Sequence, residues 1–143
     1  MSHNLVFNIL PFDLRDTQEA ETPLPVEPQN LADTLRANWH EGDIQTYTKD
    51  NETEVRFYRT SNKYGLLLVA HYDESLGGCF FVNGLPKTLA TELILWYRKY
   101  IPHKFPLFVV VVESGKIYEL TPSTTIEDFH AMYPYSVDGR WEW

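Results

Sequence analysis

The stretch Pro86–Asp128 constrains the fold more than any other part of this 143-residue chain. It begins with apolar side chains at helical spacing, which predict an amphipathic helix that Pro102 ends. These apolar side chains are Leu89, Leu93, Trp96, Tyr97 and Tyr100. The Phe- and Val-rich segment Leu107–Glu113 then turns into Lys116–Leu120, which predicts a β-hairpin. The stretch therefore predicts a helix and two strands, and it contains no catalytic motif.

The opposite face of the same helix is polar, and we expect it to face solvent. Its polar residues are Thr91, Glu92, Arg98 and Lys99. Leu95 lies among them, so the spacing predicts an exposed leucine, which either stands alone or contacts a partner. After the hairpin, Thr125 and Asp128 form a capping pair that predicts a short C-terminal helix carrying Ile126, Phe129 and Tyr133.

The N-terminal part predicts one strand, one irregular segment and one helix. Leu5–Leu10 can form the strand. Asp13–Gln29 mixes acidic residues with prolines, which predicts an extended acidic surface segment rather than regular structure. The apolar spacing in Leu31–His40 predicts a helix, with Asn30 and Asp33 as its capping pair.

Four further strands are predicted between the two long helices, at Asp43–Thr48, Glu54–Thr60, Tyr64–Tyr72 and Gly77–Val82. The unbroken apolar run Gly65–Ala70 predicts a central strand covered on both faces. Runs of strands between isolated helices indicate an α+β fold with a mainly antiparallel sheet of about six or seven strands. Two longer helices and one short C-terminal helix would pack on that sheet, in a single domain spanning residues 1–143.

The charge balance limits the classes of partner. A net charge of −8 and the absence of a basic stripe oppose binding to nucleic acid or anionic membranes and favour a basic protein partner. Aromatic residues make up 15% of the chain, more than a small core needs, so we expect some at a binding surface. Cys79 is the single cysteine, and no secretion signal or membrane span is recognisable, which together favour a cytoplasmic location.

Acidic and aromatic residues gather around the first predicted hairpin, and this cluster is the candidate binding surface. Its members are Trp39, Glu41, Asp43, Tyr47, Glu52, Glu54 and Tyr58. One interpretation is a solvated sheet edge that its charges keep from pairing with other chains. The other is a binding surface, in which aromatic anchors provide contact area and carboxylates match Lys or Arg side chains of a partner.

Cys79 and His71 offer an alternative, enzymatic interpretation. Cys79 follows two glycines and could act as a nucleophile, with His71 as its base and Asp73 orienting the imidazole. The sequence favours the other interpretation, in which Cys79 is an inert core thiol at the start of a buried strand, because free cysteine is among the most buried residue types. His71 and Asp73 alone do not make a metal site, and the other histidines show no ligand spacing, so we expect no metal and no cofactor.

The chain shows two resemblances to known proteins. The segment Trp96–Arg98 with Pro102, followed by Glu119–Pro122 and Thr124–Thr125, resembles a motif of uncharacterised bacterial domains, and this implies no activity. The small acidic α+β form is similar in general character to bacterial immunity proteins, which block basic toxins. That similarity implies a class of partner and carries over no site residue.

The sequence therefore predicts a non-enzymatic protein-binding domain, an inhibitor or immunity-type protein for a basic partner, with a small hydrolase or transferase as the alternative. We expect a monomer rather than a homodimer, because the net charge repels identical copies. A dimer would instead cover Leu95, the apolar strand Leu107–Val112 and the aromatic tail that ends at Trp141 and Trp143.

Overall fold

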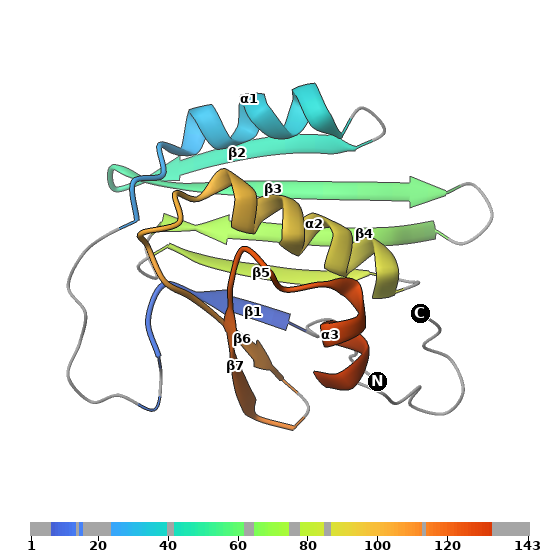
Figure 1. The fold of residues 1–143 in the computed structure, drawn as a ribbon. Helices are drawn as coiled ribbons and strands as arrows, with labels where there is room; N and C mark the ends of the chain where they lie inside the picture. The colour runs from blue at the N-terminus through green and yellow to red at the C-terminus, as the bar shows by residue number, and fades with distance from the viewer. Residues whose placement is uncertain are drawn as a thin grey trace.

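The computed structural model describes residues 7–13, 15, 24–39, 42–61, 65–74, 78–84, 87–112 and 114–132 (Figure 1). They form an α+β fold, as the sequence predicts. The elements in chain order are β1 (Phe7–Leu10), α1 (Pro28–Asn38), β2 (Asp43–Lys49), β3 (Glu52–Ser61), β4 (Gly65–Asp73), β5 (Cys79–Gly84), α2 (Lys87–Tyr100), β6 (Leu107–Val111), β7 (Lys116–Leu120) and α3 (Ile126–Met132).

All seven described strands belong to one antiparallel sheet in the order β2-β3-β4-β5-β1-β6-β7. The first strand of the chain lies inside the sheet, where Phe7 pairs with Val82 of β5 on one side and Val111 of β6 on the other. The apolar strand β6 is therefore hydrogen-bonded along both edges, by β1 and β7. This pairing removes the exposed apolar edge that its sequence would otherwise offer to another chain.

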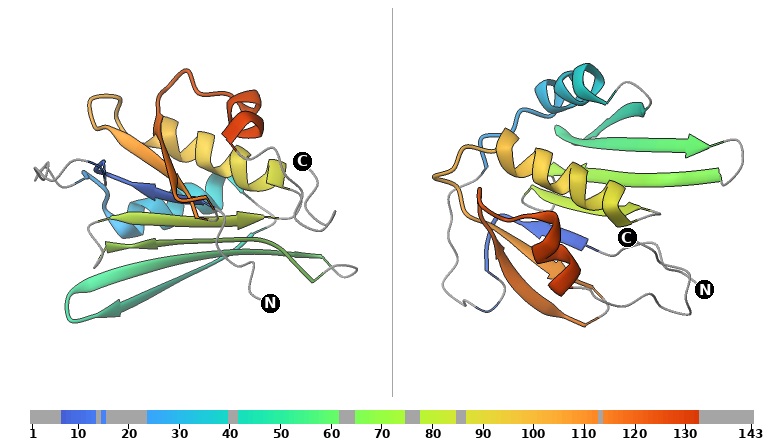
Figure 2. Two further views of the ribbon diagram at one scale, coloured as in Figure 1. Left: turned by 90° about the horizontal axis from the view of Figure 1, so that it is seen from below. Right: turned by 45° about the vertical axis from the view of Figure 1, so that its right-hand side comes forward.

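The described helices lie against one face of the sheet (Figure 2). Burial alternates along the strands accordingly, and in β6 every second residue is buried from Leu107 to Val111. Val69 of β4 points to the other face and is only half-buried. The expectation that the apolar run Gly65–Ala70 is covered on both faces is therefore wrong for Val69, because within the described residues no helix packs on that side. We call the side away from the helices the open face.

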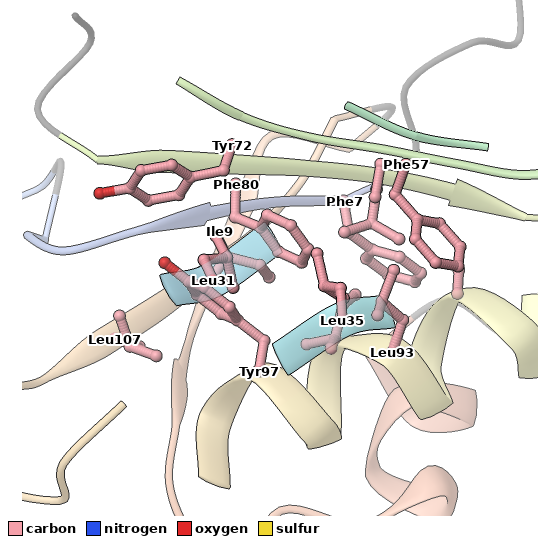
Figure 3. Packing of buried hydrophobic residues seen from close by; sticks show 14 of the residues in the cluster. Phe7, Ile9, Leu31, Leu35, Phe57, Tyr72, Phe80, Leu93, Tyr97 and Leu107 are labelled. Carbon is pink, nitrogen blue, oxygen red and sulfur yellow. The ribbon is translucent and has the colours of Figure 1, made fainter. Parts of the chain in front are cut away.

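Aromatic side chains from both layers fill the space between the sheet and the helices (Figure 3). Phe80 of β5 stacks on Tyr97 of α2 with ring centroids 4.3 Å apart. Phe7 of β1 meets Phe129 of α3 edge to face at 5.3 Å. Offset stacking and edge-to-face contacts are the favoured geometries for aromatic pairs, so these rings help to hold α2 and α3 against the sheet.

Helix α1 begins at Pro28, three residues before the predicted start and inside the segment predicted to be extended. The Glu27 carboxylate accepts hydrogen bonds from the backbone N–H of Gln29 at 3.2 Å and of Asn30 at 2.7 Å. Pro28 fits the first turn because this position needs no N–H donor. The predicted cap, Asn30, instead accepts a hydrogen bond from the Tyr100 hydroxyl at 2.6 Å, which ties α1 to α2.

The polar face predicted for α2 is wrong at two positions, because Thr91 and Arg98 are buried. Leu95 is also not exposed: it is half-buried and packs against the core. Helix α2 is buried over a wider arc than its predicted apolar face, because it contacts β4 and β5 as well as α3. Periodicity predicts the centre of a buried face better than its width.

The turns and the last helix follow local sequence rules. Asp50 and Asn51 both have positive φ, at 54° and 65°, as a tight two-residue hairpin turn requires. The predicted capping pair of α3 is confirmed, since the Thr125 N–H donates to Asp128 Oδ2 at 2.8 Å and the Asp128 N–H donates to Thr125 Oγ1 at 3.3 Å. The predictions for residues 5–6, 133 and 141–143 lie outside the described residues.

Candidate functional site

The register of the sheet sets side chains in rows across the open face, because directly paired residues point to the same side. One row runs from Tyr47 of β2 through Glu54 of β3 to Asp73 of β4. The next row runs from Gln45 through Arg56 to His71. Residues that are far apart in the chain thus become neighbours around the β2–β3 hairpin.

A cavity of about 510 Å³ opens among these rows and the hairpin turn, and we call it the bowl. Its lining residues are Tyr47, Lys49, Asp50, Glu52, Glu54, Arg56 and Asp73. Four carboxylates and two cationic side chains give the lining a formal charge of −2. The bowl can therefore receive a cationic group of moderate size more readily than an anion.

Arg56 neutralises part of the acidic lining from within. Its guanidinium contacts the Glu54 carboxylate, and this hydrogen bond raises the pKa of Arg56. The same guanidinium lies 4.4 Å from the centre of the Tyr47 ring, in a cation–π contact. Arg56 thus contacts both Glu54 and Tyr47 and offsets part of the negative charge of the lining.

Tyr47 is the most exposed large hydrophobic side chain among the described residues, with 46% of its surface accessible. It lies on β2, an edge strand whose described side chains are all exposed except Ile44. A rigid ring at the rim of an acidic hollow is typical of a contact that anchors a partner.

The remaining residues of the predicted binding surface are placed unequally. Asp43 and Tyr58 pair with each other on the open face, two positions further from the hairpin turn than the pair Gln45–Arg56. Trp39 is half-buried and packs edge to face on the core side chain Phe57, with ring centroids 6.0 Å apart. Trp39 therefore stabilises the end of α1 on the helix side, and Glu41 lies outside the described residues.

The residues of the enzymatic alternative come from two adjacent strands. His71 and Asp73 share the open face as predicted, with His71 Nε2 at 3.8 Å from Asp73 Oδ2. Cys79 pairs with Asp73, whereas His71 pairs with Phe81. The thiol is buried, and both burial and the nearby Asp73 carboxylate raise the pKa of Cys79. A raised pKa disfavours the thiolate that a nucleophile needs.

A third group joins His71 and Asp73, and sequence spacing did not identify it. His71 Nε2 lies 3.8 Å from Glu54 Oε1 on the neighbouring strand. One potential ligand atom from each of Glu54, His71 and Asp73 falls within 4.8 Å of the other two. The alternation of β3 and β4 could have placed each residue on the open face, but only the strand register brings them together.

Comparison with protein-family models, curated proteins and solved structures found no match to this chain. No described helix has both the length and the apolar character that crossing a membrane requires.

Proposed function

We propose that this chain is a non-enzymatic binding module that uses the bowl to hold a cationic segment of a protein partner. The observation that carries the proposal is the lining of the bowl, where four carboxylates face two cations beside the exposed ring of Tyr47. Electrostatic attraction would speed the encounter, and the ring would provide contact area once the partner is seated. An inhibitor or immunity-type role, in which binding blocks a basic protein, fits this chemistry.

We also infer that the chain is a cytoplasmic monomer. The half-burial of Leu95 and the pairing of β6 on both edges remove two of the apolar features that favoured a dimer. A single buried cysteine suits a reducing compartment.

A cysteine-dependent hydrolase or transferase is the competing function. The burial of Cys79 and its raised pKa argue against this alternative, since a catalytic thiol must be accessible and ionised.

Charge reversal at Glu52, compared with a matched reversal elsewhere, tests the proposed surface. Glu52 lines the bowl, whereas Glu119 is an exposed glutamate on β7, at the opposite edge of the sheet. Immobilised wild-type protein, Glu52→Lys and Glu119→Lys would each capture proteins from a lysate of the source organism, followed by quantitative mass spectrometry. Both variants change the net charge equally, so a difference between them reports the location of the charge.

We expect a specific partner to be a basic protein that Glu119→Lys retains and Glu52→Lys loses. With that partner purified, Glu52→Lys should slow association on the order of tenfold at low ionic strength and flatten the salt dependence of the association rate. Tyr47→Ala should speed dissociation with little effect on association. Equal effects of the two charge reversals on every captured protein would refute the bowl as the binding surface.

A further inference from the structure

We propose that Glu54, His71 and Asp73 form a binding site for one divalent transition-metal ion. This inference goes beyond the proposed function, because it requires no protein partner. It starts from the one described group of at least three His, Cys, Asp or Glu side chains whose ligand atoms approach one another closely enough to hold a metal ion.

The two strands hold the three side chains in place before any metal binds. Glu54 of β3 and Asp73 of β4 are directly paired in the sheet, and His71 lies two residues from Asp73 on the same face. His71 Nε2 is 3.8 Å from one oxygen of each carboxylate. Bonds of about 2.1 Å to a metal ion require ligand atoms about 3.0 to 3.4 Å apart, for octahedral to tetrahedral geometry. Small side-chain rotations would close this difference without moving the backbone.

The pairing of Glu54 with Asp73 also has an electrostatic consequence. Like charges directly opposite each other on neighbouring strands destabilise a sheet. Both side chains are also partly withdrawn from water, with 23% and 18% of their surfaces exposed, and His71 is 36% exposed. Arg56 offsets part of this repulsion by contacting Glu54, and a dication bound between the two carboxylates would offset it further.

The donor set selects the class of metal. One imidazole nitrogen and two carboxylate oxygens suit borderline ions such as Zn²⁺, whereas Mg²⁺ and Ca²⁺ prefer oxygen donors alone. Three protein ligands leave at least one coordination position for water. Glu54 and Asp73 also line the bowl, so that position can be reached from solvent.

The positive charge of Arg56 should weaken metal binding at this site. Its guanidinium already contacts the Glu54 carboxylate. A metal ion must share Glu54 with this cation, and the two positive charges repel each other at short range. Removing the charge of Arg56 should therefore strengthen metal binding, whereas removing a ligand should weaken it.

Isothermal titration with Zn²⁺ tests the site, using the full chain without an affinity tag. We expect wild type to bind one Zn²⁺ at this site, and His71→Gln, Asp73→Asn and Glu54→Gln to weaken binding at least about tenfold each. Arg56→Gln should tighten it about three- to tenfold. His103→Gln is the matched control, because His103 is an exposed histidine beyond the end of α2, and its affinity should equal that of wild type.

A thermal melt with and without Zn²⁺ provides a second readout and checks folding. Zn²⁺ should raise the melting temperature of wild type and Arg56→Gln, and should leave that of His71→Gln unchanged. The proposal is overturned if His71→Gln and Asp73→Asn bind Zn²⁺ as wild type does, or if Arg56→Gln binds more weakly. It is also overturned if Mg²⁺ matches Zn²⁺ in affinity, which would indicate only a diffuse acidic surface. The proposed partner binding stands apart from these outcomes, since Glu52 is not one of the three ligands.

Discussion

Replacing Arg98 by methionine is expected to remove about 3 kcal/mol of folding stability. Arg98 is only 2% exposed, although it lies on a helix face that the sequence predicts to be polar. Its guanidinium donates to the backbone carbonyls of Leu120 at 3.2 Å, Ile101 at 3.2 Å, Pro102 at 3.0 Å and Phe105 at 3.0 Å. These bonds join the end of α2, the segment that follows it and the end of β7. Burial lowers the pKa of Arg98, as expected for a cation withdrawn from water.

The magnitude follows from what methionine leaves behind. Nη1 donates to one carbonyl, and the two N–H groups of Nη2 are shared among the other three. Three N–H donors of a charged group, at about 1.5 to 2 kcal/mol each, give about 4.5 to 6 kcal/mol. The methionine variant buries no charge on folding, and this absence of a desolvation cost offsets the loss by about 1 to 3 kcal/mol. A net loss of about 3 kcal/mol remains.

Urea unfolding at pH 7, followed by circular dichroism, measures the loss. The midpoint should fall and the denaturant slope should stay unchanged, because the folded and unfolded states expose the same surface as in wild type. Arg98→Lys keeps the charge, but its donors lie on one nitrogen and cannot reach the carbonyls that Nη1 and Nη2 reach separately, so we expect an intermediate loss of about 1 to 2 kcal/mol. Lys99→Met, at the exposed neighbouring position, should change stability by less than about 0.5 kcal/mol.

Two results would refute this reasoning. If Arg98→Met is as stable as wild type, the cost of burying the guanidinium equals or exceeds the value of its four hydrogen bonds. If Lys99→Met is as damaging as Arg98→Met, the effect comes from the helix surface in general and not from the buried network.

Three further predictions concern the core and the thiol. Gly42→Ala should cost about 1 to 3 kcal/mol in urea unfolding, because a Cβ at Gly42 overlaps the Phe57 ring; unchanged stability would contradict this close contact. Burial raises the pKa of Tyr97 and Tyr72 above 10.0. The free energy of unfolding should therefore keep its full value below pH 10 and fall above it by about 1.4 kcal/mol per pH unit for each tyrosine, because the unfolded chain loses these protons first. Tyr97→Phe should reduce this slope and gain up to about 1 kcal/mol at pH 7, since within the described residues the Tyr97 hydroxyl has no hydrogen-bond partner; a loss at pH 7 would show that it has one. Cys79 should react with iodoacetamide on the order of 100-fold more slowly in the native than in the urea-unfolded protein. Fast labelling of the native protein would instead support Cys79 as a catalytic nucleophile.

The sequence alone determined most of the elements and the fold class. The helical spacing around Leu93 and Tyr97 and the capping pair Thr125–Asp128 each depend on residues within a few positions of one another. Alternation and turn residues identify a strand or a hairpin in the same local way, as at the positive-φ turn Asp50–Asn51. Such features are readable because neighbours in the chain settle them.

Tertiary structure decided where these elements lie and which side chains meet. Nothing local places β1 between β5 and β6, and nothing local tells that α3 covers one side of α2 and that four carbonyls surround Arg98. The start of α1 also differs from the prediction: Glu27 caps the helix, and the side chain of the predicted cap, Asn30, accepts a hydrogen bond from Tyr100 of α2 instead.

The candidate site shows the same division between local pattern and tertiary contact. Alternation within a strand places Glu54 on one face of β3, and places His71 and Asp73 together on one face of β4. Whether these three side chains meet depends on the register between the strands, and a slip of one residue would turn one set to the opposite face of the sheet. That register is set by the burial of apolar side chains such as Val55, Phe57 and Tyr72 beneath the helices, so the core on one face decides which charges meet on the other.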